Sequence, residues 1–255
     1  MLKKELFHIG FIPDGNNRWA VENDKSIFYA YRQGAERAKE AIKHSDEAGI
    51  HTLTFWALST ENWRGRPKGE LDFLVSLFVE LTDEYLQDAG QHGVRVVHLG
   101  RKDRLPGQLV ERLEAVERET AENTEHTLNL ALDYGGQDEI IRATHKIIGA
   151  VASGSLDPSQ LEETVASDED RVPKTVYSKY LDTSDQPHPF PDFVVRTSGE
   201  MRLSGFLPWQ SVYAELYFAP CFWPDFGATE FETSLEIFQD RNRRFGGGHV
   251  GEEGS

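Results

Sequence analysis

Short apolar stretches alternate along the chain with longer segments in which apolar residues recur every three or four positions. The short stretches predict strands at residues 7–13, 51–58, 94–99, 127–132, 192–197 and 212–218. The helical spacing lies at about 34–48, 69–90, 107–123, 136–152 and 228–243. Nearly continuous apolar strands separated by helices indicate an α/β fold, with a single domain built on a central, mostly parallel six-stranded sheet surrounded by helices.

Two segments interrupt this pattern. Residues 153–191 are rich in Ser, Asp, Glu and Pro, which indicates a looser excursion with one or two short helices. The stretch 246–255 consists mainly of Gly and Glu and predicts a disordered tail. The folded domain is therefore expected to span residues 1–245.

Composition narrows the class of protein. The chain has 27 Lys and Arg against 43 Asp and Glu, a net charge of −16, which argues against a nucleic-acid-binding protein because that class needs a basic face. Cys221 is the one cysteine, so an internal disulfide is impossible and a reducing compartment is expected. No signal-peptide pattern and no apolar run of about 18 residues is present, so we expect a soluble, cytoplasmic protein.

The stretch FIPDGNNRWA at residues 11–20 carries the first chemical signal. It places a carboxylate, bare backbone and a cation where the first strand ends, which is where open parallel sheets bind ligands. Gly15 permits close approach of an anion, Arg18 offers donors to phosphate oxygens, and Asp14 tolerates a phosphate only through a divalent cation. The stretch alone predicts a magnesium-diphosphate site or a simple capped turn equally well.

Two further clusters favour the binding site. The strand at 51–58 is followed by Ser59-Thr60-Glu61-Asn62-Trp63 and two arginines. The segment 194–218 places Arg196, Arg202 and Ser204 around a glycine, and Glu215 interrupts an apolar strand as a lone acid. Three strand ends with the same chemistry predict one shared anion pocket.

These stretches resemble the cis-prenyltransferase family, whose best-known members are undecaprenyl diphosphate synthases. The resemblance runs over residues 8–245 and rests on four motifs in family order: PDGNNRWA, ALSTENWRGRP, NLALDYGG and RTSGEMRLSGFLPWQSVYAELYF. It implies Z-prenyl chain elongation, in which isopentenyl diphosphate is added to an allylic diphosphate and diphosphate leaves. It also implies Mg²⁺ as cofactor, a homodimer, an apolar tunnel for the product, and transient contact with membranes through that product.

The resemblance assigns roles to single residues. Asp14 matches the aspartate that places magnesium and assists diphosphate departure, Asn62 matches a residue that helps proton removal, and Glu215 would complete the metal site with Asp14. The residues that would bind substrate are Gly15, Asn16, Asn17, Arg18, Trp19, Tyr31, Ser59, Thr60, Glu61, Trp63, Arg66, Arg196, Arg202 and Ser204.

Several positions depart from the usual bacterial pattern. Near the second helix, Ile27 stands for an arginine and Tyr31 for a histidine, and the adjacent Arg32 is a candidate to compensate. Met201 stands for a histidine, and Asp133 and Gln137 stand for an asparagine and an arginine.

Other departures fall close to the substrates. Gly205 and Pro208 replace an asparagine and a leucine. One extra residue leaves Arg64 and Arg66 as alternatives for one motif arginine, and Pro67 favours Arg66. Trp56 is a candidate to narrow the tunnel. Primer, product length and pathway stay open.

Other functions compete with chain elongation. A non-catalytic partner subunit of the same fold would be expected to lose Asp14 and the phosphate-binding loop, and both are present. A synthase of short products, or one that joins two allylic units in an irregular linkage, is a further alternative, and the intact RTSGEMRLS and STENW motifs favour ordinary condensation over the irregular linkage. A nucleotide-binding regulatory protein would need a glycine-rich nucleotide motif, and the sequence has none.

Overall fold

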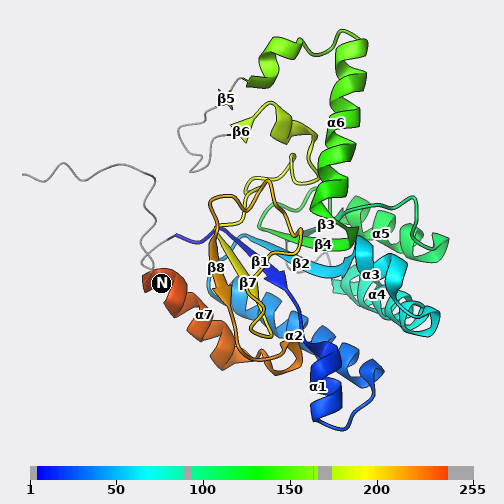
Figure 1. The fold of residues 1–255 in the computed structure, drawn as a ribbon, viewed down its shortest axis with the longest axis vertical. Coiled ribbons are helices and arrows are strands. Elements are labelled where there is room, and N and C mark those ends of the chain that lie inside the picture. Colours follow the sequence, from blue (N-terminus) through cyan, green and yellow to red (C-terminus); the bar gives the residue numbers. More distant parts are fainter. Residues whose placement is uncertain (1–4, 89–92, 163, 166–173, 241–255) are drawn as a thin grey trace, which may run out of the picture.

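The fold is a six-stranded parallel sheet with helices packed around it (Figure 1). A computed structural model describes residues 5–88, 93–162, 164–165 and 174–240. The sheet order is β3-β4-β2-β1-β7-β8, and every neighbouring pair is parallel. The strands are β1 (His8–Ile12), β2 (Thr52–Ser59), β3 (Val94–Leu99), β4 (His126–Tyr134), β7 (Phe193–Arg196) and β8 (Glu215–Phe218). All six predicted strands are thus confirmed.

Helices follow most strands, as the spacing predicted. They are α1 (Asn16–Glu22), α2 (Ile27–Glu47), α3 (Thr60–Gly65), α4 (Lys68–Asp88), α5 (Gly107–Glu119), α6 (Gly136–Ala152) and α7 (Ala228–Asp240). Two differences have the same cause. The α2 helix begins at residue 27 instead of 34 because Ser26 caps it, and the residues after β2 form α3 because the Ser59 side chain accepts a hydrogen bond from Asn62 N–H.

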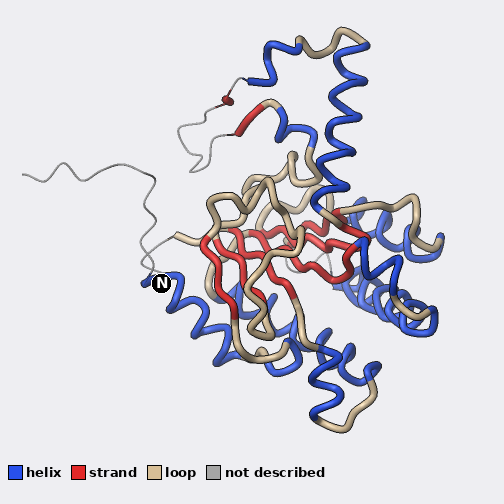
Figure 2. The backbone as a smooth tube through the Cα atoms, in the orientation of Figure 1, coloured by secondary structure: helices blue, strands red, loops and turns tan. Residues whose placement is uncertain are grey.

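The two faces of the sheet are covered differently. On one face, Phe11, Phe55 and Phe193 pack against α2 and α7, with Phe231 and Phe238 contributed by α7. On the other face, Val194 packs against the irregular segment that holds Phe206 and Leu207. The strands form one layer, with helices and irregular segments around it (Figure 2).

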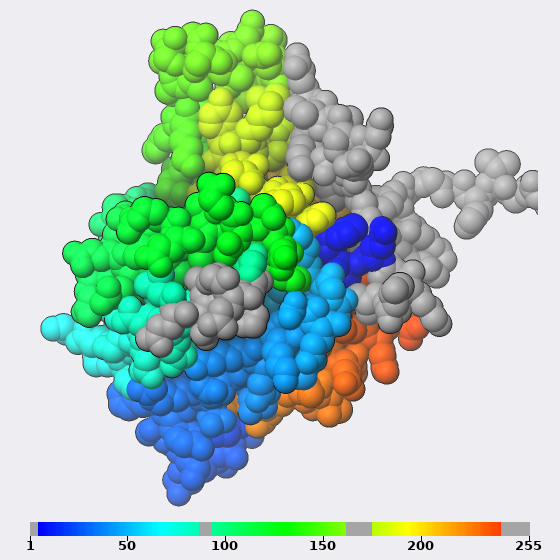
Figure 3. Space-filling view, turned by 180° about the vertical axis from the view of Figure 1, so that it is seen from behind, coloured from blue at the N-terminus to red at the C-terminus, as the bar shows by residue number. Residues whose placement is uncertain are grey.

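The excursion at 153–191 contains short elements only. It holds η1 (Pro158–Glu162), an antiparallel pair of β5 (Thr164–Val165) and β6 (Lys174–Thr175), and η2 (Tyr177–Tyr180). A small cluster of Ile147, Leu156 and Val176 attaches it to α6. Together with α6 it projects from the body of the molecule (Figure 3). The predicted tail at 246–255, and the ends of the predicted helices beyond residues 88 and 240, lie outside the described residues.

Candidate active site

The carboxyl ends of β1, β2 and β7 meet at one edge of the sheet and bring the three predicted clusters together. Asp14 follows β1, Ser59 ends β2 and Arg196 ends β7. The Arg196 guanidinium donates to Asp14 Oδ2 at 2.8 Å, and Arg18, one turn along α1, lies 3.5 Å from Asp14 Oδ1. The first two phosphate-directed arginines therefore flank one carboxylate.

The electrostatic setting keeps Asp14 ionised. Partial burial on its own raises the pKa of this carboxyl, but the hydrogen bond and charge of Arg196, with the charge of Arg18, hold the pKa below its ordinary value. The backbone of Asp14 is fixed as well. Its N–H donates to Thr197 Oγ1 at 2.9 Å, and the same hydroxyl donates to its carbonyl at 2.7 Å.

Gly15 shapes the turn between Asp14 and α1. Its φ of 103° lies in the left-handed region that favours glycine. A Cβ at this position would lie 2.5 Å from Phe222, so a side chain is excluded by packing as well as by backbone conformation. The turn therefore needs a glycine at position 15 both for its positive φ and for its close contact with Phe222, and the sequence motif alone did not predict that contact.

Arg196 and Arg18 are held by hydroxyl groups of one loop, residues 197–204. Arg196 is buried and donates to Ser204 Oγ at 2.8 Å and to the Arg202 carbonyl at 2.5 Å. Arg18 donates to Ser198 Oγ at 2.7 Å and to Glu200 at 3.1 Å. The side chain of Arg202 is exposed and pairs with Glu200. The loop thus builds a cationic wall that one acid, Glu200, partly balances.

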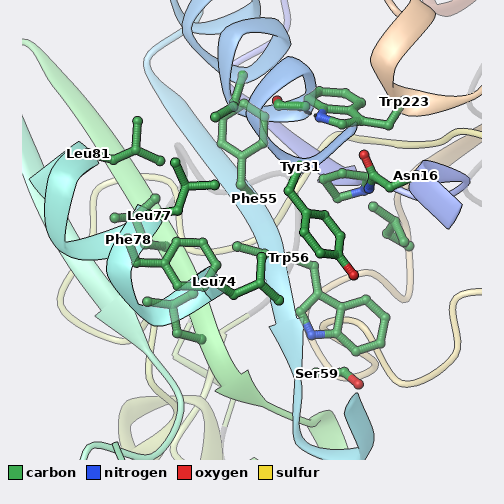
Figure 4. A pocket seen from close by; sticks show the side chains of 18 of the residues that line it. Asn16, Tyr31, Phe55, Trp56, Ser59, Leu74, Leu77, Phe78, Leu81 and Trp223 are labelled. Carbon is green, nitrogen blue, oxygen red and sulfur yellow. Dashed lines mark hydrogen bonds between the residues drawn. The ribbon is translucent and has the colours of Figure 1, made fainter. Parts of the chain in front are cut away.

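A cavity of about 630 Å³ opens from this wall into the protein. At its polar end lie the residues from Asp14 to Arg18 together with Arg196 and Ser204. The remaining wall is largely apolar and comes from α2, β2, β4 and α4, with Leu74, Leu77, Phe78 and Leu81 on α4. Figure 4 shows Asn16 and Ser59 on one side of this space and Leu77, Phe78 and Leu81 on the other.

Three side-chain nitrogen and oxygen atoms at this cavity are buried and have no hydrogen-bond partner within the described part of the chain. They are Asn16 Oδ1, Arg66 Nε and Arg196 Nε. Buried polar atoms in folded proteins normally have a partner. Two unused N–H donors of guanidinium groups suit an anionic ligand.

A polar cluster of Tyr31, Arg66 and Glu70 stands in the cavity wall. Arg66 donates to the Tyr31 hydroxyl, which donates to Glu70 at 2.9 Å. Burial raises the pKa of Tyr31 to about 12, so its hydroxyl stays protonated at neutral pH. Arg66 lines the cavity and Arg64 does not, which agrees with the choice of Arg66 from Pro67.

The structure brings most of the predicted substrate residues to one cavity. Those that line it are Asp14, Gly15, Asn16, Asn17, Arg18, Tyr31, Ser59, Glu61, Asn62, Arg66, Arg196 and Ser204. The others lie beside it. The Trp19 indole donates to Asp225 at 2.7 Å, and Thr60 is buried as the first residue of α3. Trp63 packs with α4, and the Arg202 side chain is exposed.

The predicted partnership of Glu215 with Asp14 is not formed in this chain. Glu215 begins β8 opposite Phe193, whereas Arg196 ends β7 opposite Phe218. Glu215 therefore stands three ladder positions from the site edge, and it does not line the cavity. Strand register sets which end of the sheet a side chain reaches, so within one chain Glu215 lies away from Asp14, and its role in the metal site stays a prediction.

Of the two acids predicted to bind the metal, Asp14 lines the cavity. Among the described residues, no group of three or more His, Cys, Asp or Glu is arranged to hold a metal. One carboxylate beside a phosphate-binding wall still fits Mg²⁺, which commonly binds through one or two carboxylates, substrate phosphates and water. The residues therefore fit a metal that arrives with its diphosphate and do not fit a preformed metal centre.

The departures noted in the sequence have local explanations. Arg32 donates to Glu80 on the outer side of α2 and does not line the cavity, so it does not replace the missing arginine. The Met201 side chain is exposed. Asp133 is buried and forms two 2.6 Å hydrogen bonds with Arg104, an ion pair beneath Thr60.

Two further departures concern one loop. Gly205 has a φ of 94°, a left-handed conformation that asparagine also tolerates. Pro208 packs directly against Gly136 at the start of α6. We find no structural account of Gln137.

Sequence reasoning missed one wall of the cavity and one anchor of the site. Ala35, Ala38 and Ile42 on α2 line the cavity, at a helical spacing that continues from Tyr31. That spacing was the available signal, since small residues on one helix face leave room beside it. Thr197, which holds the Asp14 backbone, carried no signal in the sequence.

Comparisons with known proteins show which family the chain belongs to. Residues 12–246 match the family described as "Putative undecaprenyl diphosphate synthase". An isoprenyl transferase of Streptococcus mutans is 38% identical over 248 residues, 96% of this chain and 95% of the relative. One from Thermotoga maritima is 40% identical over 240 residues, covering 94% and 96%.

Two solved structures share the fold. Lavandulyl diphosphate synthase from Lavandula x intermedia, in complex with dimethylallyl diphosphate, has a TM-score of 0.85 and 31% identity over 95% of this chain and 98% of that chain. A probable undecaprenyl diphosphate synthase from Campylobacter jejuni has a TM-score of 0.72 and 30% identity over 96% and 100%. The chain described here belongs to the undecaprenyl diphosphate synthase family, and it is an enzyme that transfers prenyl groups.

Proposed function

We propose that this enzyme elongates prenyl chains by condensing isopentenyl diphosphate with an allylic diphosphate, forming a Z double bond and releasing diphosphate. One observation carries the proposal. A single cavity joins a wall of arginines around Asp14 to a largely apolar interior, which matches a molecule with a diphosphate at one end and a hydrocarbon chain at the other.

The proposed reaction uses the two ends of the cavity differently. The C–O bond of the allylic diphosphate breaks, the allylic carbon bonds to the double bond of isopentenyl diphosphate, and a proton leaves the new unit. Gly15, Asn16, Asn17 and Arg18 bind the allylic diphosphate, and Arg196 with Ser204 binds isopentenyl diphosphate. Their donors stabilise charge on the leaving group, and fixing both substrates lowers the entropic part of the barrier.

Asp14 and Asn62 have separate roles in this scheme. Asp14 would hold a Mg²⁺ ion that, when bound, would supply charge neutralisation for the diphosphate. Asn62 lies in the first turn of α3, where its N–H is bound by Ser59. A neutral amide is a poor base, so Asn62 positions the substrate and the leaving diphosphate accepts the proton.

The allylic substrate class has separate support. The lavandulyl diphosphate synthase neighbour was crystallised with dimethylallyl diphosphate. We extend from the family resemblance that the enzyme works as a homodimer in the cytoplasm and meets membranes through its product. Within the described part of the chain, no helix has the length and apolar character needed to cross a membrane.

A second candidate is the coupling of two allylic diphosphates, and the same neighbour, a lavandulyl diphosphate synthase, binds an allylic diphosphate. The exposed Met201 and the glycine at 205 lie in the loop assigned to isopentenyl diphosphate, where this chain departs from the bacterial pattern. An enzyme that uses a different second substrate would be expected to differ in the residues of this loop, which would contact that substrate.

One assay separates the two reactions. Purified enzyme with Mg²⁺ receives dimethylallyl, geranyl, farnesyl or geranylgeranyl diphosphate, each with and without labelled isopentenyl diphosphate, and products are resolved by length and double-bond geometry. Elongation requires the label, whereas allylic coupling proceeds with dimethylallyl diphosphate alone. Asp14→Asn and a chelated sample serve as controls. Folded enzyme that yields no product under any condition would refute both and favour a non-catalytic partner subunit.

A further inference from the structure

Lys39 of α2 and Glu84 of α4 line the cavity and are also partly exposed. Their side chains are 39% and 47% exposed, and their Nζ and Oε2 atoms lie 2.6 Å apart. Because the same two side chains contact both the cavity and solvent, the protein is only one layer of side chains thick at this position. At this place the Lys39–Glu84 ion pair lies between the cavity and solvent, and Lys39 also contacts Glu36 at 3.2 Å.

This ion pair stands at the end of the cavity remote from Asp14. On α4, Glu70 contacts Tyr31 near the polar end, and Leu74, Leu77 and Leu81 then line the cavity in succession up to Glu84. From Glu70 to Glu84 the helix rises about 21 Å, at ~1.5 Å per residue. A chain that grows from the diphosphate end reaches Lys39 and Glu84 last.

The residues beside this pair are otherwise suited to hydrocarbon. Ile42 of α2 and Leu81 and Tyr85 of α4 line the same end of the cavity. The Thr82 hydroxyl donates to the Phe78 carbonyl of its own helix, so its hydrogen is already bonded and does not need a partner in the cavity. Besides the ion pair, the largely buried Tyr85 hydroxyl is the polar group among these residues that has no hydrogen-bond partner within the described part of its own helix.

A second pair continues the same line on the outer surface. Arg32 donates to Glu80 at 2.9 and 3.1 Å. Arg32 precedes Lys39 by two turns of α2, and Glu80 precedes Glu84 by one turn of α4. Arg32 also experiences the charge of Glu84, and Glu80 that of Lys39, so the four groups act as one network. We call these four residues, Arg32, Lys39, Glu80 and Glu84, the α2–α4 seam.

Exposed ion pairs hold weakly and respond to salt, because water competes for both partners and ions screen the charges. A seam of this kind can open without unfolding a core. We propose that the Lys39–Glu84 pair closes the far end of the cavity and thereby sets the length at which a growing prenyl chain meets resistance. This inference rests on the proposed elongation activity.

The test compares Lys39→Ala and Glu84→Ala with the charge swap Lys39→Glu/Glu84→Lys. We expect each single variant to raise the fraction of the longest products about two- to five-fold, as expected for the loss of an exposed pair. The swap should shift the distribution back toward that of the wild type, but not fully, because Lys39 also pairs with Glu36. Asp83→Ala is the matched control, because Asp83 also forms an exposed interhelical pair on α4, with Arg112, and does not line the cavity.

A second readout does not depend on the reaction. Stopped-flow binding of the apolar fluorophore N-phenylnaphthylamine reports entry into the cavity. Association should be faster in both single variants, faster in wild type at high salt, and unchanged in Asp83→Ala. Unchanged product lengths in an active enzyme, or unchanged entry rates, would overturn the seam proposal. A wild type that elongates no primer would refute the proposed function, while the entry rates would still decide whether the seam gates the cavity.

Discussion

At the scale of single residues, the charge on Asp14 is fixed by its two arginine neighbours. Because the folded-state pKa lies below the ordinary value of 3.8, the stabilisation from this carboxylate is complete above that pH and is lost as pH falls through the lower folded value. Asp14 is ionised at any pH near neutrality. An acidic limb of the activity profile above about pH 5 must therefore belong to another group.

Asp14→Asn keeps the volume of the side chain and removes its charge. We expect kcat to fall about 10²- to 10³-fold, the usual effect of removing one electrostatic element of a preorganised site. Arg196 is buried and loses its carboxylate partner, so some loss of stability is expected too. Thermal melting beside steady-state kinetics separates the two effects, and a variant with wild-type kcat would exclude Asp14 from the reaction.

Arg64 and Arg66 offer a matched comparison two residues apart. Arg66 faces the cavity with an unpartnered buried Nε, whereas Arg64 does not line it. Arg66→Ala should raise KM for a diphosphate substrate about ten- to a hundred-fold, the loss expected for a charge-assisted hydrogen bond. Arg64→Ala should change KM little. Equal effects of the two substitutions would show that Arg66 does not contact substrate.

At the scale of elements, replacing each of two glycines of α6 with alanine is expected to change stability in opposite directions. A Cβ on Gly136 would lie 2.0 Å from Pro208 Cδ and 2.7 Å from the Gly205 carbonyl, whereas Gly149 has nothing within 4 Å. Gly149→Ala should stabilise the protein by about 0.5–1 kcal/mol through helix propensity. Gly136→Ala should destabilise it despite the same propensity gain. Urea unfolding measures both, and a stabilised Gly136→Ala variant would contradict the observed packing.

The strands were predictable from sequence because buried parallel strands are apolar on both faces, as Phe193, Val194 and Val195 illustrate. Helix starts were less predictable. Ser26 and Ser59 each begin a helix through one side-chain hydrogen bond, and nothing in apolar spacing reports such a bond.

The site was predictable to the extent that its residues follow strand ends directly. Asp14, Ser59 and Arg196 follow or end strands whose carboxyl ends must meet. Glu215 shows the limit of this reasoning. The sequence identified its strand, but the strand begins three residues later than predicted, and register places the acid at the opposite end of the ladder.

At the scale of the whole molecule, two buried histidines make stability depend on pH. Burial is the largest cause that lowers the pKa of His8 and of His98 to about 4, so both are neutral in the folded protein at pH 7. Between pH 6.5 and 4 the unfolded chain binds more protons than the folded one. Stability should therefore fall as pH drops through this window, by up to about 1.4 kcal/mol per pH unit for each histidine.

Urea unfolding at pH 7 and at about pH 5 tests this dependence. His8→Asn should flatten the slope of stability against pH. His145→Gln, at an exposed position, serves as the control substitution. An equal slope in wild type and His8→Asn would show that His8 does not drive acid sensitivity.

The cavity has a consequence for how this protein balances stability against function. Close-packed interiors gain stability from filled volume, and about 630 Å³ beside α2 is left unfilled. Ala35 and Ala38 keep that volume open. A larger apolar side chain at Ala38 would fill it, raising the melting temperature while removing the space that the substrate chain needs. An apolar chain that binds in this cavity should therefore stabilise the folded protein, because it fills the volume that side chains leave open.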